Sequence, residues 1–112
     1  MIHGVDIKGY TWSRTTAGRG KRKETVTAGC WLLEHISTGK FIIGSSPQVS
    51  QEIDRHIALL NDGKHPNKKL SKLVNMDPDL MAIEIPMASQ PKAKKLEREI
   101  RVNVNPEYLL LN

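Results

Sequence analysis

The chain has 112 residues, enough for one domain with a single modest core. Hydrophobic residues make up 38% of it, and no apolar run approaches the roughly 20 residues that cross a bilayer, so no membrane partner is expected. The one cysteine excludes an internal disulfide framework and a cysteine-rich zinc site. A cytoplasmic location is the simplest expectation, since the cytoplasm is reducing.

Positive charge is concentrated toward the two ends of the chain. The net charge is +5; residues 1–30 carry six basic against two acidic side chains, and residues 91–112 carry five against three. The segment between them is close to neutral. This distribution is typical of a core with phosphate-binding segments at its ends, and it also fits a solubilising surface. Nucleic acid is therefore the expected partner.

Residues 1–26 are expected to form a basic N-terminal arm or an extra strand, followed by one domain at 27–112. Residues 13–26 are polar and contain glycine, and such a segment orders only against a partner. Tyr10 and Trp12 alternate with small or polar residues, which fits a short strand. The cations of the arm expected to contact DNA are Arg19, Lys21, Arg22 and Lys23.

A hairpin and a helix are predicted next. The apolar runs in residues 27–35 and 41–44 are separated by a Ser-Thr-Gly-Lys turn, which predicts two antiparallel strands. Ser46 and Pro47 are typical of a helix start, and the apolar residues at 49, 53, 57 and 60 share one helix face. Gly63 suits the position just past the helix end, where φ is positive.

The second half of the chain predicts two more helices and one more strand. Pro66 opens a short helix with apolar residues at 70, 73 and 74, and its outward cations are candidate DNA contacts: Lys68, Lys69 and Lys72. Residues 81–85 alternate as in a strand, and residues 92–100 suit a helix. The element order predicts an α/β (α+β) fold, with a small three-stranded antiparallel sheet flanked by helices.

The central part of the chain carries several short motifs in a fixed order. They are Gly29-Cys30-Trp31, Gly39-Lys40, Ile42-Ile43-Gly44, Ser45, His56 and the segment Gly63-Lys64-His65-Pro66-Asn67-Lys68-Lys69-Leu70. In this order and spacing, residues 29–75 resemble the GIY-YIG nuclease superfamily, typified by phage homing endonucleases. Residues 76–112 match it only loosely. The resemblance implies the fold of a metal-dependent DNA endonuclease.

The resemblance also places the catalytic positions of the family on this chain. Trp31 and Ile42 stand where the family has its two tyrosines, and Glu52 stands where it has an arginine. His56 matches the family histidine. Arg55, three residues beyond Glu52 and near the same helix face, is the candidate replacement for the missing cation. The candidate catalytic residues are His56, Arg55 and Lys40.

A glutamate on a later helix binds the metal in the family. The resemblance places it at Glu99, with Glu97 as second choice and Glu84 as a third option. Mg²⁺ takes oxygen ligands and few of them from protein, so one carboxylate suffices. Magnesium is expected only if the chain is catalytically active. Interleaved with Lys95 and Arg98, the two helical glutamates also fit a solvated charged face.

Three functions stay open on this reasoning. One is a DNA-binding protein with a degenerate or rearranged active site, and another is an active, divergent magnesium-dependent DNA endonuclease. The last is a protein-binding regulator or inhibitor on the same scaffold. Each residue also has a structural interpretation: Trp31 and Ile42 as core, His56 as a hydrogen-bonding residue, His65 as a helix cap. A monomer or a homodimer is expected.

Overall fold

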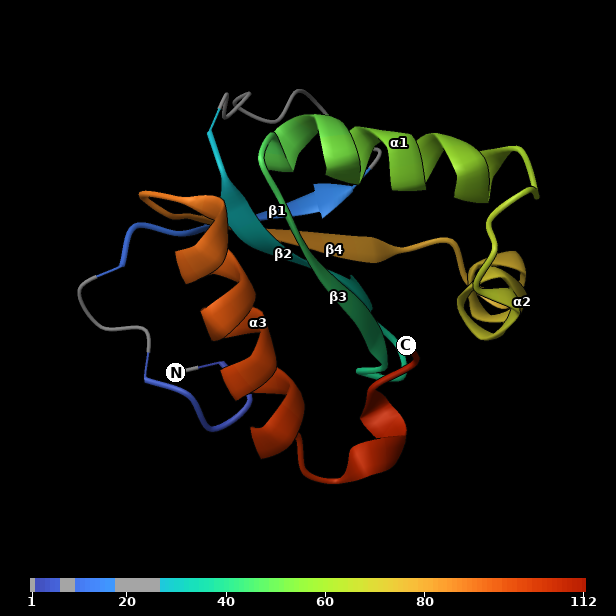
Figure 1. Cartoon of the computed structure of the whole chain (residues 1–112). Coiled ribbons are helices and arrows are strands. Elements are labelled where there is room, and N and C mark those ends of the chain that lie inside the picture. Colours follow the sequence, from blue (N-terminus) through green and yellow to red (C-terminus); the bar gives the residue numbers. More distant parts are fainter. Residues whose placement is uncertain (1, 7–9, 18–26) are drawn as a thin grey trace.

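The computed structural model describes residues 2–6, 10–17 and 27–112, and its centre is one antiparallel sheet (Figure 1). The strands are β1 (Ser13–Ala17), β2 (Gly29–His35), β3 (Phe41–Ser46) and β4 (Leu80–Pro86). The helices are α1 (Val49–Asn61), α2 (Lys68–Met76) and α3 (Gln90–Asn103), and a short 3₁₀ helix, η1, spans Glu107–Leu109. The strand order is β1-β4-β2-β3.

The α/β (α+β) class and the order of the six predicted elements are confirmed, but the predicted strand count is wrong. The sheet has four strands, because β1 adds to the edge of β4. The sequence of β1, SRTTA, carries no apolar alternation that would mark a strand. Backbone pairing with β4, with Ser13 opposite Glu84, makes this segment a strand.

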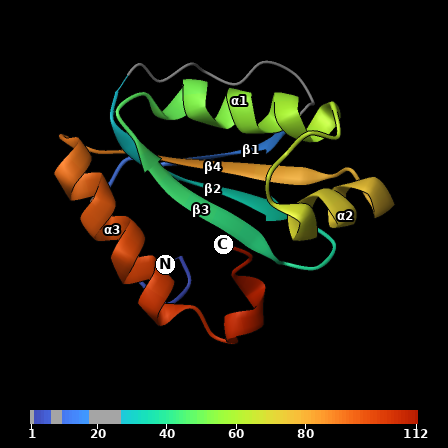
Figure 2. The same ribbon diagram turned by 45° about the vertical axis from the view of Figure 1, so that its right-hand side comes forward.

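Helices cover both faces of the sheet (Figure 2). The α3 residues Leu96 and Ile100 pack on one face with Leu32 of β2. The α1 residue Ile53 and the α2 residue Leu70 pack on the opposite face. Because successive side chains of a strand point to opposite faces, a strand covered on both sides carries a continuous apolar run, as β2 does from Cys30 to Leu33. No helix in the described parts of the chain has the length and apolar character to span a bilayer.

Residues of the expected N-terminal segment pack with the domain. Ile2 and Val5 are buried in the core cluster shared with α3, and the ring of His3 stacks on Phe41 with 4.1 Å between centroids. The arm cations Arg19, Lys21, Arg22 and Lys23 lie outside the described residues.

Both helix starts around the candidate site differ in detail from the sequence prediction. Helix α1 begins at Val49, and Ser46 Oγ accepts a hydrogen bond from the Gln48 backbone N–H at 3.0 Å. The side chain of Asn67, and not of His65, caps α2, because its Oδ1 accepts from the Leu70 N–H at 3.0 Å. An asparagine at this position satisfies one of the free N–H groups of the first turn.

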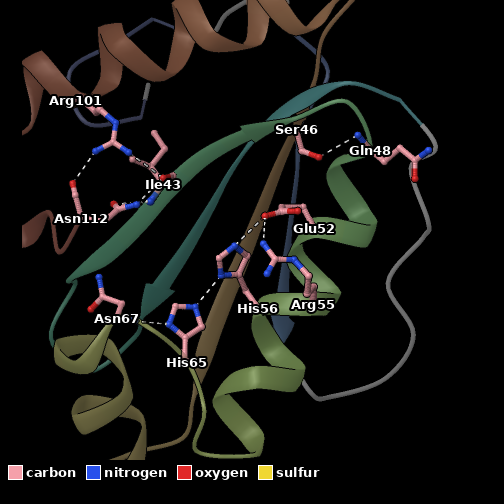
Figure 3. Close-up of polar contacts among 10 residues, drawn as sticks. All are labelled: Ile43, Ser46, Gln48, Glu52, Arg55, His56, His65, Asn67, Arg101 and Asn112. Atoms are coloured by element: carbon pink, nitrogen blue, oxygen red, sulfur yellow. Dashed lines mark hydrogen bonds and ion pairs between the residues drawn. The ribbon is translucent and has the colours of Figure 1, made fainter.

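The end of the described chain runs along the outer edge of β3. The Leu111 N–H donates to the Phe41 carbonyl at 2.8 Å. The side-chain amide of Asn112 then pairs with both backbone groups of Ile43, at 3.0 and 2.8 Å (Figure 3). Arg101 of α3 also donates to the Ile43 carbonyl, at 3.1 Å. These bonds satisfy edge groups that would otherwise be open to another strand.

Candidate functional site

Three polar side chains of α1 meet at one carboxylate oxygen. Arg55 Nη2 donates to Oε1 of Glu52 at 2.5 Å, and His56 Nε2 lies 3.1 Å from the same oxygen (Figure 3). Residues three and four apart lie on the same side of a helix, which brings these groups together. The structure therefore joins the candidate residues Arg55 and His56, and it places Glu52 between them.

A second histidine extends this contact beyond α1. His65 lies in the loop that connects α1 to α2, and only 2% of its surface is exposed. Its Nε2 atom lies 2.7 Å from Nδ1 of His56. Its Nδ1 atom accepts a hydrogen bond from the Asn67 backbone N–H at 3.0 Å. The four residues form a continuous chain of hydrogen bonds, from Asn67 through His65 and His56 to Glu52.

The backbone donor at one end of this chain sets the tautomer of both rings. A backbone N–H can only donate, so Nδ1 of His65 must be the unprotonated nitrogen. Neutral His65 then carries its proton on Nε2 and donates to Nδ1 of His56. His56 in turn carries its proton on Nε2 and donates to Glu52. Every hydrogen bond in the chain therefore points the same way, toward the carboxylate.

The charges of this chain shift in directions that favour neutral histidines and an ionised glutamate. Burial lowers the pKa of His56 below its usual value of 6.5, although the carboxylate of Glu52 opposes this. Burial also lowers the pKa of His65, and the neighbouring His56 adds to the effect. The hydrogen bond from Arg55 lowers the pKa of Glu52. At neutral pH both histidines of this hydrogen-bond chain are neutral, so its only charged groups are Glu52 and its ion-pair partner Arg55.

Trp31 lies against the ring of His56. Their ring centroids are 4.5 Å apart and the planes are tilted by 43°. Gly44 is the cross-strand partner of Trp31 on β3, and a Cβ atom at that position would lie 2.5 Å from Cζ2 of the indole. The indole N–H is buried without an acceptor among the described residues. Trp31 and Ile42 are both buried in the core, the structural role that was open for them.

Lys40, the third candidate catalytic residue, has a different neighbour. Its ammonium lies 5.8 Å from the ring centroid of Tyr108 in η1. The contacts that the structure gives for Lys40 do not include His56.

The candidate metal ligands lie on α3, which covers the opposite face of the sheet from α1 and α2. Glu97 accepts a hydrogen bond from Arg101 Nε at 2.8 Å, and Glu99 lines a separate surface hollow. Glu84 is buried and accepts from Ser50 Oγ at 3.1 Å.

These carboxylates do not converge on a common point. The described ranges contain no group of three or more histidine, cysteine, aspartate or glutamate side chains that is placed to hold a metal ion. The site that the resemblance implies needs only one protein carboxylate, so this finding does not test it and the magnesium expectation stays a prediction.

Sequence reasoning missed the pairing of the two histidines. The motif segment around His65 pointed to this loop, but the only role inferred for His65 was a helix cap. His65 lies nine positions after His56, and no periodicity relates them. Only the turn after α1, with Gly63 at φ +70°, brings the second ring back to the first.

Comparisons of the chain with protein-family models, with curated proteins and with solved structures found no match. The likeness to the GIY-YIG superfamily therefore rests on the motif residues quoted above.

Proposed function

We propose that the chain is a DNA-binding protein on a GIY-YIG-like scaffold, in which the former catalytic position now has a structural role. The observation that carries the proposal is the hydrogen-bond chain through His56 and His65. A general base needs a free lone pair to accept a proton from water. In the tautomers that the chain requires, both lone pairs of the two rings are already used by hydrogen bonds.

The charge at this position points the same way. Cleavage of a phosphodiester needs preorganised positive charge where negative charge develops on the phosphate. Here the guanidinium of Arg55 is paired with the carboxylate of Glu52, so the pair presents no net positive charge. A carboxylate at this position also repels a phosphate that approaches α1.

Helix α2 supplies the surface for DNA. Lys68, Lys69 and Lys72 are exposed, and the sequence of the helix contains no acidic residue. The helix is held in place by the buried Leu70 and by the cap from Asn67, so its lysines project from a fixed support. Lysines on a helix bind phosphates as point charges, which gives affinity without choosing a base sequence.

Duplex binding followed by fluorescence anisotropy, over a range of salt concentrations, tests this surface. The double variant Lys68→Gln/Lys72→Gln is expected to weaken binding by about tenfold and to reduce the salt slope by about 2, because two phosphate contacts are lost. The matched control is Lys94→Gln/Arg98→Gln, which removes two exposed cations at the same spacing from α3. Equal losses in both variants, or none in the α2 variant, would contradict the proposal.

A plasmid-nicking assay with Mg²⁺ or Mn²⁺ tests the loss of catalysis. Wild-type protein is expected to bind the plasmid and to leave it uncut, and Glu52→Arg is expected to bind more tightly. Nicking by the wild type would instead support the active endonuclease. Absence of DNA binding would support the protein-binding regulator.

A further inference from the structure

A second surface with affinity for nucleic acid lies on the other face of the sheet. Arg14 of β1 pairs with Ile83 of β4, and Ile83 belongs to the core cluster under α3. Paired residues point to the same face, so Arg14 projects on the α3 side. Its guanidinium carbon lies 5.9 Å from the ring centroid of Trp12, which places Trp12 on that side as well.

Tyr10 continues the same row. It lines a surface hollow of about 270 Å³ together with Met87, which follows β4, and residues of α3. Tyr10, Trp12 and Arg14 are thus alternate residues of the segment that leads into β1, and their side chains lie on the α3 side. Helix α3 packs mainly on β2 and β3, so it leaves this outer part of the sheet uncovered (Figure 1).

The two aromatic side chains of this row are exposed to solvent. Tyr10 is 44% exposed and Trp12 is 42% exposed. The chain has five Phe, Trp and Tyr residues, of which Trp31 and Phe41 are buried in the core. Two of the remaining three therefore lie in this one row. Half-exposed rings of this kind are suited to stack on an added ligand.

Cations border the row on the α3 side. Lys92 and Lys95 are exposed, lie one helix turn apart and line the hollow beside Tyr10. The hollow also contains Glu99, so its two ammonium groups outnumber its one carboxylate. Its volume lies just below the roughly 300 Å³ of the smallest drug-sized pockets, which suits a planar ring better than a large ligand.

We propose that this aromatic-basic strip, formed by Tyr10, Trp12, Arg14, Lys92 and Lys95, binds single-stranded nucleic acid. Bases stack on aromatic faces, and Arg and Lys side chains neutralise the backbone phosphates. A duplex hides its base faces in its own stack, so the exposed rings select an unpaired strand. The strip lies on the opposite face from the α2 lysines, and the two surfaces bind different forms of nucleic acid.

Fluorescein-labelled oligo(dT) and oligo(rU) are the probes that test the strip, with anisotropy and tryptophan fluorescence as readouts. Trp12→Ala and Tyr10→Ala are each expected to weaken binding of at least one probe by about 5- to 100-fold, because one stacked base is lost. Trp12→Phe is expected to retain most of the affinity. The variant Lys92→Gln/Lys95→Gln is expected to lower the salt slope by about 1.4.

The matched aromatic control is Tyr108→Ala, which removes an exposed ring from η1 at a different place on the surface. It is expected to leave oligonucleotide binding unchanged. The proposal is overturned if Trp12→Ala and Tyr10→Ala bind both probes as wild type does, or if Tyr108→Ala loses as much affinity. It is also overturned if the strip variants lose affinity only for an acidic peptide, which would assign the strip to a protein partner.

The two proposals fail separately. Loss of duplex binding in Lys68→Gln/Lys72→Gln, with oligo(dT) binding intact, supports the α2 surface and leaves the strip unaffected. Loss of oligo(dT) binding in Trp12→Ala, with duplex binding intact, supports the strip and leaves the α2 surface unaffected.

Discussion

The Nδ1 atom of His56 lies 2.7 Å from the Nε2 atom of His65, and this contact joins helix α1 to the loop that leads into α2. The direction of the hydrogen bond is set two residues further on, where the Asn67 backbone donates to the other nitrogen of His65. A backbone group thus determines the protonation pattern of a side chain on a different helix.

The tautomers of His56 and His65 can be measured by NMR. At neutral pH we expect His56 and His65 each to carry a single proton, on Nε2. Long-range ¹H–¹⁵N NMR spectra distinguish the two ring nitrogens by their shifts. A proton on Nδ1 of His65 would show that the chain runs in the opposite direction or is broken.

Stability is expected to fall on mild acidification. Burial lowers the folded-state pKa values of His56, His65 and His3 below the ordinary value of 6.5. The unfolded chain therefore binds these protons more tightly. The free energy of unfolding has its maximum contribution from these groups above about pH 6.5, and it decreases as the pH drops below that value. Protonated His56 would also present an N–H to the donating nitrogen of His65.

Urea unfolding at several pH values measures this decrease. The variant His56→Gln/His65→Gln should show a flatter dependence on pH below 6.5 than the wild type. His3→Gln is the comparison that removes only the remaining histidine with a lowered pKa, which is half-buried. An equally steep dependence in the double variant would mean that other groups cause the acid sensitivity.

Gly44→Ala is expected to destabilise the protein by about 1–3 kcal/mol, because overpacking a filled core forces neighbours to move. The added Cβ would lie 2.5 Å from Cζ2 of Trp31, an atom of a rigid ring. Ser45→Ala is the adjacent control and should change stability by about 0.5 kcal/mol or less. Thermal unfolding gives both values.

A double-variant cycle assigns the clash to the indole. Trp31→Phe removes the atoms that the new methyl group would meet, so Gly44→Ala should be less harmful in that background. Additive effects of the two substitutions would place the clash elsewhere.

Asn67→Ala is expected to destabilise the protein by about 1–2 kcal/mol, because α2 loses its side-chain cap. The substitution also removes the bond from Asn67 Nδ2 to the Leu111 carbonyl. Asn75→Ala, an exposed position inside α2, is the matched control. Equal urea midpoints for the two variants would indicate that the cap contributes little.

Cys30 is expected to be unreactive in the folded protein. It is fully buried between the sheet and α3, and burial raises the pKa of its thiol to about 12. The thiolate is the reactive form, so at pH 8 almost none is present. A thiol reagent should label Cys30 only at the rate at which the domain unfolds, and rapid labelling under native conditions would show that this part of the core opens by itself.

Much of this fold can be predicted from local patterns. The apolar runs of β2 and β3 around Gly39 define the hairpin, and the spacing of Val49, Ile53 and Leu60 defines α1, because side-chain periodicity reflects which face is buried. An extra strand in the N-terminal segment was one of two alternatives, because the side chains of β1 are polar and its strand conformation comes from pairing with β4. Tyr10 and Trp12 suggested a short strand, but β1 begins only at Ser13, and no local signal shows which face the two rings occupy.

The sequence by itself determined the α+β class, the basic ends and the chemical character of the candidate residues. The resemblance that it carries predicts an arginine at the position where Glu52 stands. Only the tertiary structure decided that Glu52 holds both Arg55 and His56, that His65 completes the hydrogen-bond chain, and that the α3 glutamates lie on the other face. The reason is physical: periodicity encodes burial within one element, whereas contacts between elements depend on how turns and sheet pairing bring distant residues together.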